Sequence, residues 1–175
     1  RPDLILLTDD VYGTFVPGFR SLMGAFPYNT IGVYSYSKYF GCTGWRLGVI
    51  AVHEKNLFDD MIARHPEAVK KKLDKRYGGP TLEPRKIAFI DRIVADSRDV
   101  ALNHTAGLSL PQQVMMSLFS IYELMDAKKD YQKACIGIVK KRVYATIEGL
   151  GIKVEANPQF DWYYGIIDLE FWLKK

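Results

Sequence analysis

Short apolar runs separated by turn residues characterise the N-terminal part of the chain. Three runs rich in β-branched and aromatic residues, at 3–9, 30–36 and 47–52, predict strands of a sheet. The first run is largely apolar and ends in two carboxylates, Asp9 and Asp10. This pattern is typical of a buried parallel strand that carries polar groups at its carboxyl end. Because open α/β sheets bind ligands at that end, we expect a functional site there.

The pattern of apolar positions becomes helical after residue 54. Apolar residues then recur at the spacing of a helix face, and proline or glycine residues interrupt the pattern at 66, 78–80 and 149–151. The predicted helices lie at 57–64, from 67 onward, and at 83–96, 109–126 and 130–150. Two further strands are expected at 152–155 and 162–171. Strands and helices together predict an α/β fold.

Composition and charge exclude several classes of protein. The chain has 175 residues, of which 48% are hydrophobic and 25% charged, as expected of a globular chain. Its net charge of +4 is concentrated at 70–76, where a solvated helix face explains the basic run better than a nucleic-acid surface. Cys42 and Cys135 share no metal or redox spacing, so we expect reduced thiols, a cytoplasmic location and no metal. No apolar run approaches the ~20 residues of a membrane span.

The segment 35–48 holds the strongest candidate for chemistry, Lys38. Small hydroxyl residues and glycines surround this lysine, and Arg46 follows eight residues later. Glycines let the backbone approach a bulky aldehyde cofactor that binds a lysine amine, and serine and arginine can bind its phosphate. A pyridine cofactor also needs a carboxylate at its ring nitrogen and a donor to its ring oxygen. Asp9 and Tyr12, at the end of the first strand, can supply both.

Together these residues resemble the fold-type I pyridoxal-phosphate enzymes of the aspartate aminotransferase superfamily. The resemblance rests on an Asp-x-x-Tyr strand end, a Ser-x-x-Lys segment and an arginine eight residues after the lysine. It implies that Lys38 binds pyridoxal 5'-phosphate covalently, that Asp9 pairs with the ring nitrogen and that Tyr12 donates to the ring oxygen. By the same resemblance, Ser35 and Arg46 hold the phosphate.

The resemblance also implies a division into domains and an assembly. Residues 1–126 would be the C-terminal part of a large cofactor domain with a mostly parallel sheet and a helical insert at about 54–126. Residues 127–175 would be the interdomain helix and the first strands of a small α+β domain. Thr105 or Ser109 would reach the cofactor of a neighbouring subunit, in a homodimer or higher homo-oligomer; a loop followed by a helix N-cap at Ser109 explains the same sequence.

The residues of these motifs, and those of the segment 95–109, are similar in sequence to the L-aspartate β-decarboxylase branch of this superfamily. This implies decarboxylation of L-aspartate at C4 to L-alanine and carbon dioxide, with an aspartate aminotransferase side activity that uses a 2-oxo acid. The motif residues are common to both reactions, so a general class I/II aminotransferase and a non-catalytic aminotransferase-like module stay open. Family members run to several hundred residues, and their phosphate-binding loop and substrate-carboxylate arginine have no counterpart here. We therefore expect an internal fragment that is inactive alone.

Overall fold

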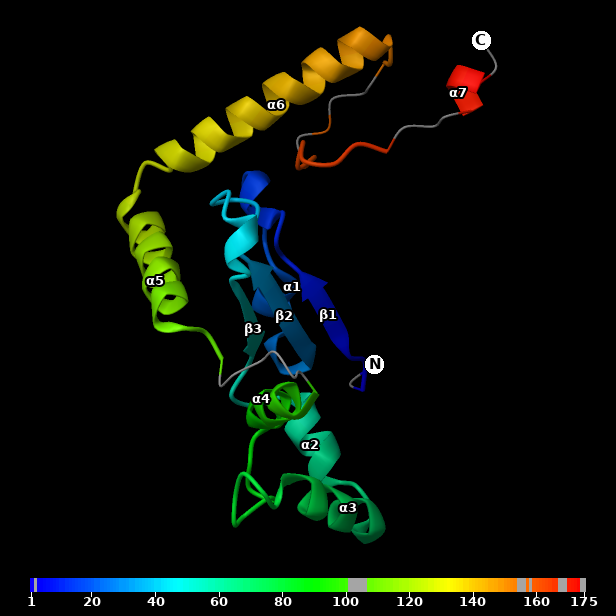
Figure 1. The fold of residues 1–175 in the computed structure, drawn as a ribbon. Coiled ribbons are helices and arrows are strands. Elements are labelled where there is room, and N and C mark those ends of the chain that lie inside the picture. The colour runs from blue at the N-terminus through cyan, green and yellow to red at the C-terminus, as the bar shows by residue number, and fades with distance from the viewer. Residues whose placement is uncertain (2, 101–106, 154–156, 158, 167–169, 174–175) are drawn as a thin grey trace. The chain divides into compact units, whose positions relative to one another are not determined.

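The computed structural model describes residues 1, 3–100, 107–153, 157, 159–166 and 170–173 (Figure 1). These residues form two compact units. The first unit comprises Arg1–Thr8, Ser21–Val33 and Val49–Met115, and the second comprises Asp9–Arg20, Tyr34–Gly48 and Met116–Lys175.

Three strands form a sheet in the order β1-β2-β3, most of which belongs to the first unit. They are β1 (Leu6–Asp9), β2 (Thr30–Ser35) and β3 (Gly48–Val52), which confirms the three strands predicted in this part of the chain.

The described sheet is mixed, with one parallel and one antiparallel pair of neighbouring strands, where a mostly parallel sheet was predicted. The starts of β1 and β2 lie side by side, because the Asn29 side-chain amide donates to the Leu4 carbonyl oxygen at 2.8 Å, and both arrows point the same way in Figure 1. The third strand, β3, runs the opposite way: Gly32 near the start of β2 approaches Ala51 near the end of β3, whereas Tyr36, just after β2, bonds to Leu47, just before β3. With its strands and helices, the chain has a mixed α/β fold.

Helices complete the first unit around a small apolar core. They are α1 (Leu22–Ala25), the 3-10 turn η2 (Pro27–Asn29), α2 (Leu57–Ala63), α3 (Glu67–Tyr77) and α4 (Phe89–Val100). Phe58 of α2 stacks on Phe89 of α4 with ring centroids 4.7 Å apart. Leu57, Phe58 and Tyr77 are buried. Arg85 bonds to both Glu67 and Asp74 and so ties the loop before α4 to α3.

The helix predicted at 83–96 begins six residues later than expected, at Phe89. A carboxylate of another helix sets this start: Asp59 Oδ1 accepts a hydrogen bond from the Phe89 backbone N–H at 2.7 Å. The first N–H groups of a helix have no partner within the helix, so such a contact fixes where the helix begins. The partner lies 30 residues away in the chain, which is why the local sequence pattern missed it.

The second unit contains the long helix α6 (Asp130–Leu150), and α5 (Leu110–Met125) runs into it from the first unit. Both helices confirm predicted ones. The Asp126 carboxylate accepts from the backbone N–H groups of Asp130 and Tyr131, at 3.0 and 2.9 Å, and thereby caps α6. These hydrogen bonds hold the pKa of Asp126 below its ordinary value. Gly151 ends the helix in the left-handed region (φ +64°), where glycine is least strained.

The strands predicted after α6, at 152–155 and 162–171, do not form in the parts of these segments that the structure describes. Ile152 and Lys153 lie in no strand and the segment 162–166 is irregular, while residues 154–156 and 167–169 fall outside the described residues. Trp162 adopts φ +60°, and the Asp161 side chain accepts from the Tyr163 N–H at 2.9 Å, which together form a turn where an extended strand was expected. A short helix, α7 (Glu170–Leu173), follows.

Within the described ranges, none of the helices combines the length and the apolar character that crossing a bilayer would need.

Candidate active site

A short turn after β2 carries Lys38 in the second unit. The backbone N–H of Phe40 donates to the Tyr36 carbonyl oxygen at 3.3 Å, which closes one helical turn around the lysine. Gly41 ends this turn with φ +62°, a conformation that a side chain would strain, and its N–H donates to the Lys38 carbonyl oxygen at 3.1 Å. The lysine, itself half-buried, therefore stands on a backbone that is fixed on both sides.

The loop between β2 and β3 is closed at its base by Ser35 and Leu47. The Tyr36 N–H donates to the Leu47 carbonyl oxygen at 3.1 Å, and Ser35 Oγ lies 3.2 Å from the same oxygen. Ser35 Oγ also donates to Ser37 Oγ at 2.9 Å. Arg46 sits next to this closure with φ +55°, and its exposed guanidinium donates to the Thr43 carbonyl oxygen at 3.3 Å. Ser35 and Arg46 thus lie at one end of the loop.

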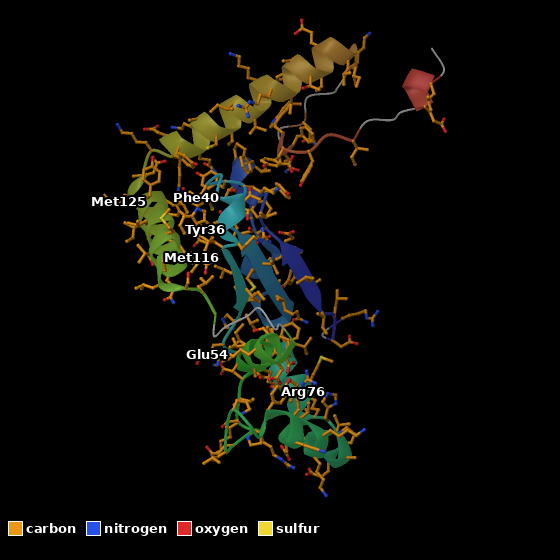
Figure 2. All side chains as sticks on the ribbon, in the orientation of Figure 1. Tyr36, Phe40, Glu54, Arg76, Met116 and Met125 are labelled. Atoms are coloured by element: carbon orange, nitrogen blue, oxygen red, sulfur yellow. The ribbon has the colours of Figure 1, made fainter. Side chains whose placement is uncertain are left out.

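Aromatic side chains hold the same turn against α5. Tyr36 and Phe40 face this helix (Figure 2), where Phe119 stacks on Phe40 at 4.7 Å and on Tyr36 at 6.2 Å between ring centroids. Tyr39, which is 2% exposed, donates from its hydroxyl to Glu123 Oε2 at 3.1 Å. Burial, reinforced by the Glu123 carboxylate, raises the pKa of Tyr39 well above its ordinary value. These contacts position Lys38 through its neighbours on both sides.

Asp9 is the last residue of β1 and Tyr12 lies three residues beyond it, so both stand at the strand end that the sequence predicted. Asp9 Oδ1 accepts a hydrogen bond from the Val11 N–H at 3.1 Å, which turns the chain out of the strand. Tyr12 then precedes the 3-10 turn η1 (Gly13–Phe15). Phe15 is buried and packs edge-on against Tyr39, with ring centroids 5.8 Å apart. The strand end that carries Asp9 is therefore packed against the turn that carries Lys38.

Two tyrosines that sequence reasoning missed, Tyr163 and Tyr164, connect these groups. The Tyr12 hydroxyl donates to the Tyr164 hydroxyl at 2.7 Å. The Tyr163 ring lies 5.2 Å from the Tyr12 ring and 5.7 Å from the Lys38 amine. Two consecutive tyrosines were the available signal, but both fell within the strand predicted at 162–171. The structure brings Tyr12 and Lys38 to the same aromatic side chain.

A pocket of about 1240 Å³ opens beside Asp9, Tyr12 and Tyr164. Its other walls come from the loop that follows η1 and from the C-terminal half of α6. Burial, followed by the hydrogen bond to Tyr164 and the charge of Asp9, raises the pKa of Tyr12 above its ordinary value. Tyr12 therefore keeps its proton at neutral pH and can donate a hydrogen bond.

Two further predicted positions, Thr105 and Ser109, were expected to reach the cofactor of a neighbouring subunit rather than this group. Thr105 lies outside the described residues. Ser109 belongs to the first unit and immediately precedes α5, where its N–H and its hydroxyl both bond to Gln112 Oε1, at 2.9 and 3.0 Å. This is the interaction of a helix N-terminus, so the helix-start interpretation of Ser109 is supported. Among the described residues, no three His, Cys, Asp or Glu side chains are grouped as a metal site would require.

Comparison with known proteins relates part of this chain to a protein family. Residues 1–79 match the family model of aminotransferase class I and II. This segment, somewhat less than half of the chain, is similar to that family. The five residues expected to bind the subunit's own cofactor, from Asp9 to Arg46, lie within the aminotransferase segment.

A curated relative extends the similarity over nearly all of the chain. It is the bifunctional aspartate aminotransferase and L-aspartate beta-decarboxylase of a Pseudomonas species, which is 54% identical over 170 residues. The aligned region covers 97% of this chain and 32% of the relative, so the chain spans about a third of the relative's length. The resemblance inferred from the motifs is confirmed.

Proposed function

We propose that this chain binds pyridoxal 5'-phosphate at Lys38. One observation carries the proposal: the Lys38 amine and the Tyr12 hydroxyl converge on the Tyr163–Tyr164 pair, beside the strand end that bears Asp9. The chemistry of these donors fits the cofactor. In the part of the chain that the structure describes, the Lys38 amine has neither a hydrogen bond nor an ion pair, so no local partner competes for it.

Each residue has a separate role in this proposal. When bound, the cofactor supplies an electron sink for charge that develops on the substrate. The Asp9 carboxylate holds a proton on the ring nitrogen, and the Tyr12 hydroxyl donates to the ring oxygen. Ser35 and Arg46 bind the phosphate, for which the Ser35 hydroxyl turns away from Ser37. The Lys38 amine, in its free and unprotonated form, would remove the proton from Cα of the amino-acid substrate and later return one.

The reaction we propose is decarboxylation of L-aspartate to L-alanine and carbon dioxide, with transfer of the amino group to a 2-oxo acid as a side activity. The relative's name, which states both activities, supports this proposal. A general class I/II aminotransferase is the second candidate, favoured by the match of residues 1–79 to that wider family. Lys38, Asp9 and Tyr12 serve either reaction equally, because both begin with loss of the Cα proton.

Product analysis separates the two candidates. Because the chain alone is expected to be inactive, the natural full-length protein that carries it is incubated with pyridoxal phosphate and L-aspartate, with and without a 2-oxo acid, and alanine, oxaloacetate and carbon dioxide are measured. Alanine and carbon dioxide without a 2-oxo acid support the decarboxylase, whereas oxaloacetate that forms only with a 2-oxo acid supports the aminotransferase. Lys38→Arg and Asp9→Asn should abolish either activity, while Lys55→Arg, at an exposed lysine of the first unit, should not. Products that persist in Lys38→Arg contradict the proposal.

We also propose that the protein assembles into a homodimer or a higher homo-oligomer. The support is a stripe of exposed apolar side chains along one face of α5: Leu110, Val114, Leu118, Ile121 and Met125. These positions follow the spacing of a single helix face, and the opposite face already packs on the Lys38 turn through Phe119. A helix that is apolar on both faces is normally covered on both. Light scattering measures the assembly, and a monomer at all concentrations contradicts it.

A further inference from the structure

The hydrogen bond from Tyr12 to Tyr164 uses the one proton that the Tyr12 hydroxyl can donate. A tyrosine hydroxyl carries one proton to donate and two lone pairs that accept. The Tyr12 proton points to Tyr164 Oη at 2.7 Å. If Tyr12 is to donate to the ring oxygen of a bound cofactor, its proton must leave Tyr164. The Tyr164 hydroxyl can then donate its own proton to a lone pair of Tyr12.

Both rings are held in place for such an exchange. The Tyr12 and Tyr164 rings meet edge to face, with centroids 4.9 Å apart, and the Tyr163 ring contacts both of them at 5.2 and 5.5 Å. The backbone of this segment is fixed by the Asp161 carboxylate, which accepts from the Tyr163 N–H at 2.9 Å. Only rotation of the two hydroxyl protons is needed to reverse the hydrogen bond, because the oxygen atoms already lie at bonding distance.

We propose that Tyr164 is a positioning residue for Tyr12: its hydroxyl holds the Tyr12 side chain before the cofactor binds and donates to Tyr12 Oη once Tyr12 donates to the anionic ring oxygen. This inference rests on the proposed function, since it concerns how the same site binds its cofactor. A hydrogen bond donated to Tyr12 makes Tyr12 a stronger donor, because hydrogen bonds in a chain polarise one another. Tyr164 thereby strengthens cofactor binding without contacting the cofactor.

The test measures binding of pyridoxamine phosphate, which has the ring oxygen and phosphate of the cofactor but no aldehyde. The Lys38 bond cannot form with this probe, so its dissociation constant reports the non-covalent contacts alone. Four variants are compared with the wild type: Tyr164→Phe, Tyr12→Phe, the double variant, and Tyr144→Phe as a control. Tyr144 lies on α6 of the same unit, is 45% exposed and uses its ring against Trp162.

Tyr164→Phe should weaken binding of the probe by about 3- to 10-fold, the worth of one hydrogen bond. Tyr144→Phe should leave the dissociation constant unchanged. In the Tyr12→Phe background, the Tyr164→Phe change should have no further effect, because there is no longer a hydroxyl for Tyr164 to assist. A merely structural role for Tyr164 would weaken binding in both backgrounds.

The outcomes separate this inference from the proposed function. Wild-type protein that binds neither pyridoxamine phosphate nor pyridoxal phosphate overturns both. Wild-type protein that binds, with a Tyr164→Phe variant that binds equally well or more tightly, overturns only the positioning role: Tyr164 would then merely occupy the place that the ring oxygen takes. Equal losses in the wild-type and Tyr12→Phe backgrounds also overturn it.

Discussion

Replacing Phe119 by alanine should loosen the turn that carries Lys38. The Phe119 ring stacks on Phe40 at 4.7 Å and on Tyr36 at 6.2 Å, and these two residues flank Lys38 in the chain. The substitution leaves α5 intact, since alanine is the best helix former. Its effect should therefore fall on the packing between helix and turn.

The magnitude follows from the burial of this ring. Truncation of a fully buried phenylalanine to alanine costs about 3–5 kcal/mol, and part of Phe119 is exposed, so a smaller loss of about 2 kcal/mol is expected from lost apolar contact. Loss of the ring–ring contacts with Phe40 and Tyr36 adds about 0.5–1 kcal/mol. The free energy of unfolding should fall by about 2–3 kcal/mol.

Urea denaturation of the wild type, Phe119→Ala and Leu118→Ala measures this change. Leu118 is the next residue of α5 and is 54% exposed, so its truncation should cost less than about 1 kcal/mol in the monomer. If Leu118 lies in an oligomer interface, its effect will depend on protein concentration, whereas that of Phe119 will not. Equal, small losses for the two variants would refute the packing described here.

Three further results are expected. Gly41→Ala should lower the free energy of unfolding by about 1 kcal/mol, because Gly41 has φ +62°. Gly44 is an exposed glycine of the same loop without a positive φ, so Gly44→Ala should change the free energy of unfolding little. Thermal melts of the two variants measure the difference. Burial raises the pKa of Tyr34 and of Tyr131 from an ordinary value of 10.0 to about 12. Because the unfolded chain loses these protons at lower pH than the folded chain, the free energy of unfolding should be intact below pH 10 and fall between pH 10 and about 12. Urea titrations at stepped pH measure this fall. Arg92 is 5% exposed, and two of its nitrogens, Nε and Nη1, have no hydrogen-bond partner among the described residues. Arg92→Met should therefore change the free energy of unfolding by less than about 1 kcal/mol. A loss above about 3 kcal/mol in urea denaturation would contradict this.

Local sequence patterns predicted those elements whose boundaries depend on local chemistry. Helix α3 follows Pro66 and ends before Gly78, and α6 ends at a left-handed Gly151, so these boundaries could be read from the sequence. The start of α4 could not, because it depends on Asp59, which lies 30 residues earlier in the chain. The strand predicted from residue 162 onward does not form at 162–166, because Trp162 adopts a left-handed backbone conformation.

In the candidate site, too, local motifs could be read from the sequence and contacts between distant residues could not. Asp9, Tyr12 and Lys38 stand in motifs with a fixed spacing, so the sequence alone was enough to select them. The hydrogen bond between Tyr12 and Tyr164 joins residues 152 positions apart, and no local pattern contains it. The domain boundary near residue 127, the cytoplasmic location and the role of Thr105 stay predictions.

The most direct test of the central claim is chemical trapping at Lys38. The protein is incubated with pyridoxal phosphate, reduced with borohydride and digested, and the modified lysine is identified by peptide mass spectrometry, with Lys38→Arg as the control. We predict one label per chain, at Lys38, and none in the control. Label that is absent, or scattered over exposed lysines such as Lys71 and Lys72 to the same extent in both proteins, would contradict the account.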